Sequence, residues 1–141
     1  MKKKILMIGN TNGLHGVPVD FYAYRQFFTS PFGGNWYHEE IEVLPNPTRR
    51  DLFKKLDAIE RANYDFIVTI FTGHGREERN DTLLGLNGDG ERIKMRDLMG
   101  LSYRQLLILD CCRSCVPTPS ETAIIEAAGT MMAMTYQNSF S

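Results

Sequence analysis

The chain has 141 residues, a length typical of one domain, and we expect a single domain over residues 1–141. Hydrophobic residues make up 43% of the composition and charged residues 23%, which excludes a wholly disordered chain. The formal net charge of -1 offers no basic excess for non-specific nucleic-acid binding, and no apolar run approaches the ~18 residues of a membrane span. The 3 cysteines do not make a disulfide framework, so we expect a reducing, cytoplasmic location.

The first half of the chain alternates short apolar runs with amphipathic segments. Residues 3–8 predict a buried strand, and a glycine-bearing loop follows it. A helix is expected over residues 18–29, because a proline suits its first turn and aromatic residues recur at spacings of three and four. Residues 41–44 predict a second strand, and residues 48–61 an amphipathic helix with a threonine as its N-cap.

The second half begins with the most strand-like run of the sequence. Residues 65–71 are β-branched, aromatic and nearly uncharged, as in a parallel sheet that is covered on both faces. A polar stretch follows over residues 75–81, and Asn87-Gly88 between apolar pairs indicates a hairpin. Residues 106–109 predict the fourth strand of the sheet.

The end of the chain completes an α/β pattern. Residues 121–128 look helical, and residues 131–136 suit either a fifth strand or a continued helix, of which we prefer the strand. The alternation predicts an open, mostly parallel sheet of order 2-1-3-4, with helices on both faces and room for the fifth strand. Ligands bind beyond the carboxyl ends of such strands, where the loops carry His15, Asp20, His74, Asp110 and Cys112.

Two short motifs at these strand ends carry reactive side chains. His74 stands between Gly73 and Gly75, which leave it poorly shielded and let a substrate backbone come close; a plain turn histidine is the alternative. Cys111 and Cys112 follow the fourth strand, and adjacent strand residues face opposite sides. We therefore expect Cys111 to be packed as a small hydrophobic residue and Cys112 to be available as a nucleophile.

Together these motifs resemble the clan CD cysteine peptidases, the caspases and metacaspases. The resemblance covers residues 3–115 and is carried by strand-Gly-His-Gly followed by strand-Asp-x-Cys-x-Ser. The segment Asp110 to Ser114, Asp-Cys-Cys-Arg-Ser, is similar to metacaspases rather than to animal caspases, which have Gln-Ala-Cys. Residues 14–20 look like the family's Leu-x-Gly-x-x-x-Asp segment.

The resemblance implies a role for each of these residues. Cys112 would be the nucleophile and His74 the general base and then acid, while the backbone N–H groups of Gly75 and Cys112 would form the oxyanion hole. Asp20 and Asp110 would lie at the floor of the first specificity pocket, where two carboxylates favour a substrate Arg or Lys. The expected substrate is a protein or peptide, and no metal or other cofactor is expected.

The sequence also departs from the family pattern. Cys115 stands where metacaspases usually have Gly, so the loop after the nucleophile is expected to differ. The chain after Cys115 is short compared with the family's small-subunit region, so we expect either that another segment or a partner chain completes the sheet, or that the chain is a minimal form of the family. Only Glu121 and Glu126 follow the nucleophile as acidic residues, so no calcium site is expected.

Three other interpretations remain open at this stage. The chain could keep the fold as a non-catalytic, partner-binding scaffold, with an unfinished sheet edge as the contact. The glycines between Gly9 and Gly16 suit a nucleotide-binding loop, although their spacing is not Gly-x-Gly-x-x-Gly. Cys112 and Cys115 form a Cys-x-x-Cys pair that would suit a redox or zinc site, with His15, His38 or His74 as a further zinc ligand.

Overall fold

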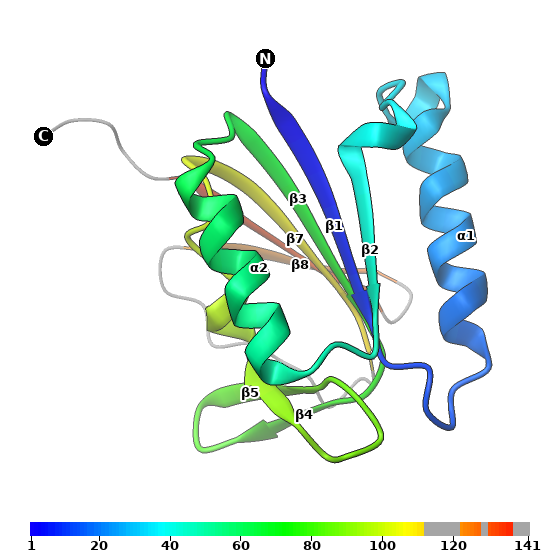
Figure 1. Ribbon diagram of the computed structural model, residues 1–141, viewed down its shortest axis with the longest axis vertical. Coiled ribbons are helices and arrows are strands. Elements are labelled where there is room, and N and C mark those ends of the chain that lie inside the picture. Colours follow the sequence, from blue (N-terminus) through cyan, green and yellow to red (C-terminus); the bar gives the residue numbers. More distant parts are fainter. Residues whose placement is uncertain (112–121, 128–129, 137–141) are drawn as a thin grey trace, which may run out of the picture.

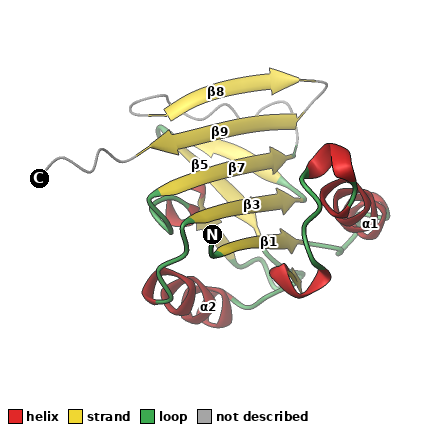
Figure 2. Cartoon of the chain, turned by 90° about the horizontal axis from the view of Figure 1, so that it is seen from above, coloured by secondary structure: helices red, strands yellow, loops and turns green. Residues whose placement is uncertain are grey.

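The computed structural model describes residues 1–111 and the strands at residues 122–127 and 130–136. Its centre is a six-stranded sheet in the order β2-β1-β3-β7-β9-β8 (Figures 1 and 2). The strands are β1 (Lys3–Gly9), β2 (Ile41–Pro45), β3 (Phe66–Thr72), β7 (Arg104–Asp110), β8 (Thr122–Ala127) and β9 (Thr130–Tyr136). The first four are parallel, which confirms the α/β class and the expected order, with β7 as the fourth strand.

Beyond β7 the sheet continues with two antiparallel strands. The strand expected over residues 131–136 is confirmed as β9, which pairs with β7. The helix expected over residues 121–128 is wrong, because Thr122–Ala127 forms β8 and pairs with β9. Alanine and glutamate favour a helix there, but Ile124 and Ile125 are β-branched and suit a strand, and the pairing with β9 decides between the two.

The two long helices cover opposite faces of the sheet. Helix α1 (Gly16–Thr29) packs on one face through Phe28, and α2 (Arg49–Arg61) packs on the other through Leu52, Leu56 and Ile59. The strands supply both cores because their side chains alternate in direction: Ile5 and Met7 of β1 face α1, while Leu6 and Ile8 face α2. Both expected helices and their placement are confirmed, although α1 begins earlier than residue 18.

The ends of the helices follow from local chemistry. The hydroxyl Oγ1 of Thr48 accepts a hydrogen bond from the backbone N–H of Asp51 at 3.1 Å, as expected of the N-cap.

Three short 3-10 helices complete the helical part, η1 (Pro31–Gly33), η2 (His38–Glu40) and η3 (Met95–Leu98). Within the described ranges, no helix combines the length and the apolar character that a membrane crossing requires.

A small antiparallel sheet lies beyond the carboxyl ends of the parallel strands (Figure 1). It contains β4 (Gly75–Glu78), β5 (Asp81–Gly85) and β6 (Arg92–Lys94). The polar stretch after His74 therefore forms an ordered hairpin, whose turn residues Arg79 and Asn80 have φ of 49° and 67°. The hairpin expected about Asn87 is confirmed, since that segment joins β5 to the antiparallel β6.

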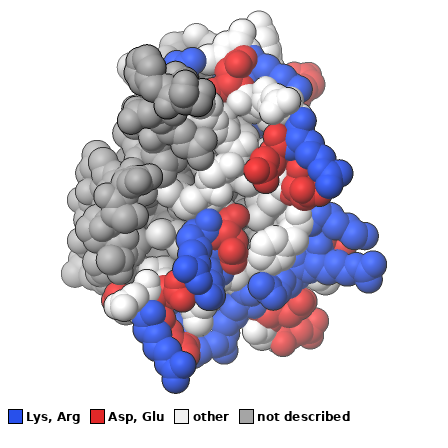
Figure 3. Space-filling view, turned by 90° about the vertical axis from the view of Figure 1, so that its left-hand side faces the viewer, with Lys and Arg blue, Asp and Glu red and all other residues white. Residues whose placement is uncertain are grey.

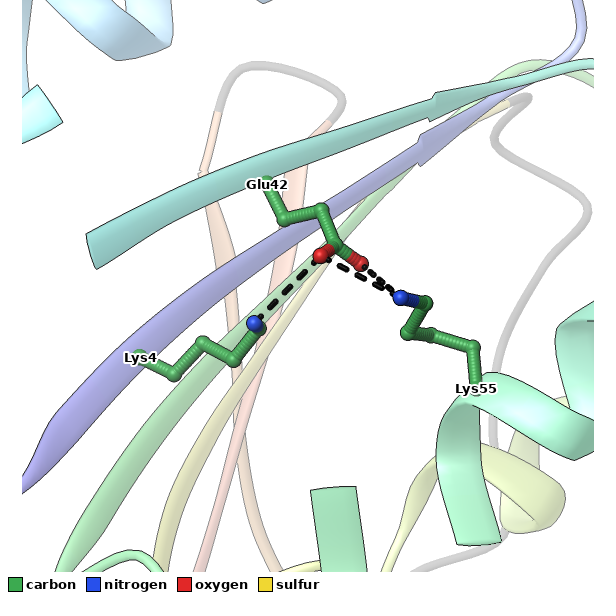
Figure 4. Close-up of polar contacts among 3 residues, drawn as sticks. All are labelled: Lys4, Glu42 and Lys55. Atoms are coloured by element: carbon green, nitrogen blue, oxygen red, sulfur yellow. Dashed lines mark hydrogen bonds and ion pairs between the residues drawn. The ribbon is translucent and has the colours of Figure 1, made fainter. Parts of the chain in front are cut away.

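A shared carboxylate ties the edge strand β2 to its neighbours (Figure 4). Glu42 of β2 lies between Lys4 of β1 and Lys55 of α2. Its Oε1 is 3.5 Å from the Lys4 ammonium and 3.3 Å from the Lys55 ammonium, and its Oε2 is 3.0 Å from Lys55. The cluster joins three elements on the α2 face of the sheet.

Candidate active site

Two carboxylates meet on the α1 face, beyond the ends of β3 and β7. Asp20 comes from α1, and its Oδ2 accepts a hydrogen bond of 2.6 Å from the hydroxyl of the buried Thr72. Asp110 ends β7, and its Oδ2 accepts one of 3.0 Å from the Tyr24 hydroxyl. The parallel register of β3 and β7 sets Thr72 beside Asp110, so the two acidic residues converge although they are far apart in sequence.

The electrostatics of this pair favour a cation. Burial raises the pKa of Asp110 above its ordinary value; the Tyr24 hydrogen bond works in the opposite direction, and repulsion from Asp20 adds to the rise. The hydroxyls of Thr72 and Tyr24 carry no charge, so they do not neutralise the carboxylates. No lysine or arginine of the described part of the chain forms an ion pair with either one. A cationic side chain that entered here would relieve the repulsion.

His74 follows the end of β3, the strand that pairs with β7. The N–H of Gly73 donates to the backbone oxygen of Asp110 at 3.2 Å and ties the two strand ends together. Gly73 has φ of 153°, and a Cβ there would lie 3.1 Å from Cζ of Phe71, so both the backbone and the packing favour glycine. The side chain of His74 is exposed, as expected for a histidine between glycines.

The backbone of Gly75 is oriented by the small sheet. Gly75 stands opposite Leu84 in the β4–β5 ladder, and the N–H of Gly85 donates to the oxygen of His74 at 2.9 Å. Hydrogen-bonded and non-hydrogen-bonded residue pairs alternate along an antiparallel ladder. His74 and Gly85 form a hydrogen-bonded pair, so the next pair, Gly75 and Leu84, exchanges no hydrogen bonds. The N–H of Gly75 therefore points away from β5, and β4 is an edge strand of the small sheet.

Of the three cysteines, the structure describes Cys111, which follows the end of β7. Cys111 is half-buried and packs against the core on the α2 face, as expected, while Asp110 lies on the α1 face. Cys112, the expected nucleophile and second oxyanion donor, lies outside the described residues, and so does Cys115. The structure therefore places the expected base and the carboxylate pair, together with Cys111, which Cys112 directly follows.

The last residue of β1, Gly9, permits close packing of α1. A Cβ on Gly9 would lie 2.7 Å from Cγ1 of Val17, and the ring of Phe21 is closer still, so glycine there lets α1 approach β1. The side chain of His15 is exposed at the start of α1 and forms no hydrogen bond or ion pair with a described residue. No group of three or more His, Cys, Asp or Glu side chains that could hold a metal ion occurs among the residues the structure describes.

Sequence reasoning missed the two hydroxyl residues that hold the carboxylates. Tyr24 follows Asp20 by four residues in α1, which is the spacing of side chains on one helix face, and this signal could have identified it. The sequence signal for Thr72 was weaker: it is a polar residue at the end of a mostly apolar buried strand, and no spacing links it to Asp20. Tyr24 lies outside the motifs that carry chemistry, whereas Thr72 directly precedes Gly73-His74-Gly75 but was given no role.

The comparison with protein families agrees with this architecture. The caspase domain, a peptidase family, matches residues 2–139, nearly the whole chain. A comparison with curated proteins finds no match. The parallel sheet with helices on both faces is consistent with a caspase-like fold. With the match extending over almost its full length, the chain belongs to the caspase domain family.

Proposed function

We propose that the chain is a cysteine endopeptidase of the metacaspase type, which cleaves peptide bonds after Arg or Lys by a Cys112–His74 dyad. The observation that carries the proposal is the half-buried pair Asp20 and Asp110, which has no cationic partner among the described residues. A substrate guanidinium or ammonium would supply that partner. A pocket for an acidic substrate residue would need basic side chains in the same place.

The proposed reaction uses the strand ends in sequence. His74 takes the proton of the Cys112 thiol, and the thiolate sulfur attacks the carbonyl carbon of the residue bound over the two aspartates. The carbon–nitrogen bond then breaks, and His74 gives its proton to the leaving amine. Water, deprotonated by His74, attacks the thioester carbonyl and releases the new carboxyl terminus together with the Cys112 thiol.

The oxyanion of each tetrahedral intermediate needs donors that are already oriented. The N–H of Gly75 is suited to this role, because Gly75 and Leu84 form a non-hydrogen-bonded pair and the N–H therefore points away from β5. The N–H of Cys112 is the second donor in the proposal. Loss of one such donor costs about 2.7–4 kcal/mol of transition-state stabilisation in acyl-transfer enzymes where this has been measured.

The test is a panel of internally quenched peptides that differ only in the residue before the cut. We expect cleavage after Arg and Lys, and none after Asp or Gln, because only a cation neutralises the two carboxylates. Rates would be measured for the wild type, for Cys112→Ala and for His74→Ala. Cys111→Ala is the matched control, since it removes the neighbouring thiol that packs against the core.

The outcomes separate the parts of the proposal. Cys112→Ala and His74→Ala should lose cleavage, and Cys111→Ala should retain it. Cleavage after Asp but not Arg would contradict the role of Asp20 and Asp110. Equal activity of wild type and Cys112→Ala would contradict the nucleophile, and absence of any Cys112-dependent cleavage would favour the non-catalytic scaffold.

A further inference from the structure

A pocket of about 200 Å³ adjoins His74 on the outer face of the small sheet. Its lining comes from all three strands and the residue before them: His74, Gly75, Arg76, Leu83, Gly85 and Arg92. The pocket is separate from the carboxylate pair, which lies on the α1 face and contributes no residue to this lining. His74 and Gly75 thus belong both to the lining of the pocket and to the proposed active site.

The strand register explains why a hollow exists there. Gly85 stands opposite Arg92 on β6, and its N–H bonds to His74 on the other side. Leu84 and Ile93 are buried in the core, so the alternate positions Leu83, Gly85 and Arg92 face outward. A Cβ on Gly85 would lie 3.7 Å from Nδ2 of Asn10 and 3.7 Å from the backbone oxygen of His74, so glycine at this position leaves space beside His74.

The pocket carries positive charge and an apolar wall. Arg76 forms an ion pair with Glu78 at 2.9 Å, whereas the guanidinium of Arg92 has no hydrogen bond or ion pair with any described residue. Basic and acidic side chains are interspersed among the coloured residues on the face drawn in Figure 3. In the pocket, two arginines lie beside Leu83, an arrangement that suits a carboxylate on a short apolar stem.

We propose that this pocket binds an acidic side chain, that of Glu or Asp, in the substrate residue that directly follows the cut bond. The inference rests on the proposed function, in which His74 protonates the leaving amine. The residue before the cut occupies the aspartates on the α1 face, so the leaving segment continues past the imidazole toward the other surface that His74 lines. Arg92 is the main specificity residue, and Arg76 contributes less because Glu78 already pairs with it.

The test uses internally quenched peptides that keep Arg before the cut and carry Glu, Gln or Lys after it. For the wild type we expect kcat/KM to fall in the order Glu, Gln, Lys, with Glu favoured over Gln by about threefold to fivefold, as for an exposed ion pair. High salt should reduce the ratio, because it screens exposed charges.

Variants of one position assign the preference. Arg92→Gln should bring the Glu-to-Gln ratio close to one, and Arg92→Glu should reverse the order so that Lys after the cut is favoured. Arg61→Gln is the matched control: Arg61 lies at the far end of α2, pairs with Asp57 at the surface and does not line the pocket, so the wild-type ratio should persist. Circular dichroism of each variant shows that the fold is retained.

Failure of this inference is distinguishable from failure of the proposed function. Equal wild-type rates for the Glu, Gln and Lys peptides, with cleavage after Arg still dependent on Cys112, would overturn the pocket and leave the peptidase proposal standing. An unchanged Glu-to-Gln ratio in Arg92→Gln would also overturn it. Absence of Cys112-dependent cleavage of every peptide would overturn both.

Discussion

At the scale of single residues, Asp110 is a carboxylate whose surroundings oppose its ionisation. Burial and the neighbouring Asp20 raise its pKa, and the Tyr24 hydroxyl offsets part of the rise. Between the ordinary and the raised pKa, the folded chain holds a proton that the unfolded chain has released. The free energy of unfolding contributed by this group therefore falls as the pH rises through that interval.

The first residue-scale prediction follows from this direction. Asp110→Asn should be more stable than the wild type at pH 7, since the amide oxygen can still accept from Tyr24 and no charge is buried. The difference should vanish in acid, where Asp110 is protonated in both the folded and unfolded chain. Thermal unfolding across a pH series measures it, and lower stability of Asp110→Asn at neutral pH would contradict the electrostatic account.

The same titration separates the causes of the shift. Asp20→Asn should lower the pKa of Asp110, because it removes the like charge, and Tyr24→Phe should raise it further, because it removes the donor. Carboxyl carbon shifts in NMR report the pKa directly. If Asp110→Asn also loses cleavage after Arg while it gains stability, the carboxylate is kept for function at a cost in stability.

At the scale of elements, the Glu42 cluster tests how much one shared carboxylate contributes to the edge of the sheet. The Glu42 side chain is 31% exposed and Lys4 16%, so water screens this pair less than a fully exposed one. Glu42→Gln should lower the free energy of unfolding by roughly 1 kcal/mol, the upper end for such pairs.

The chain offers a matched control for that loss. Asp57→Asn removes the exposed Asp57–Arg61 pair, whose side chains are 55% and 80% exposed, and should change stability much less. Urea unfolding at low and high salt would measure both variants. Equal effects of the two substitutions would mean that the position of Glu42 between β1, β2 and α2 adds nothing.

Prediction from sequence succeeded where the local pattern and the tertiary environment agree. Residues 66–72 form a buried central strand, and their β-branched and aromatic composition suits no other element. It failed over residues 122–127, where locally mixed preferences are decided by pairing with β9. The β4–β5 turn was missed because its residues Arg79 and Asn80 have positive φ, although the sequence there lacks the Asn-Gly pair that usually indicates such a turn.

At the scale of the whole molecule, the site can be anticipated from topology while its details cannot. Knowing that β1, β3 and β7 are parallel neighbours is enough to gather Asp20, His74 and Asp110 at one end of the sheet. The hydroxyl partners and the arginine pocket depend on side-chain register and on which residues of the small sheet face outward. Those features do not follow from the sequence pattern, because a shift of one residue would turn Arg92 toward the core.

The division between a large sheet and a small one predicts unequal stability within one molecule. Central strands β1 and β3 have a bonded neighbour on both sides and side chains buried against both helical layers. The small sheet has three short strands, and most of β4 is exposed. Amides of β4 to β6 should therefore exchange with solvent by local opening, well before those of β1 and β3.

Hydrogen exchange followed by mass spectrometry or NMR measures this order. The slowest amides should lie in β1 and β3 and should exchange with the free energy of global unfolding, while His74 and Gly75 should exchange with the small sheet. Glu42→Gln should speed exchange in β2 and its neighbours more than in β4 to β6. If β4 to β6 proved as protected as β3, the small sheet would be part of the same cooperative unit, and His74 would move only when the whole molecule unfolds.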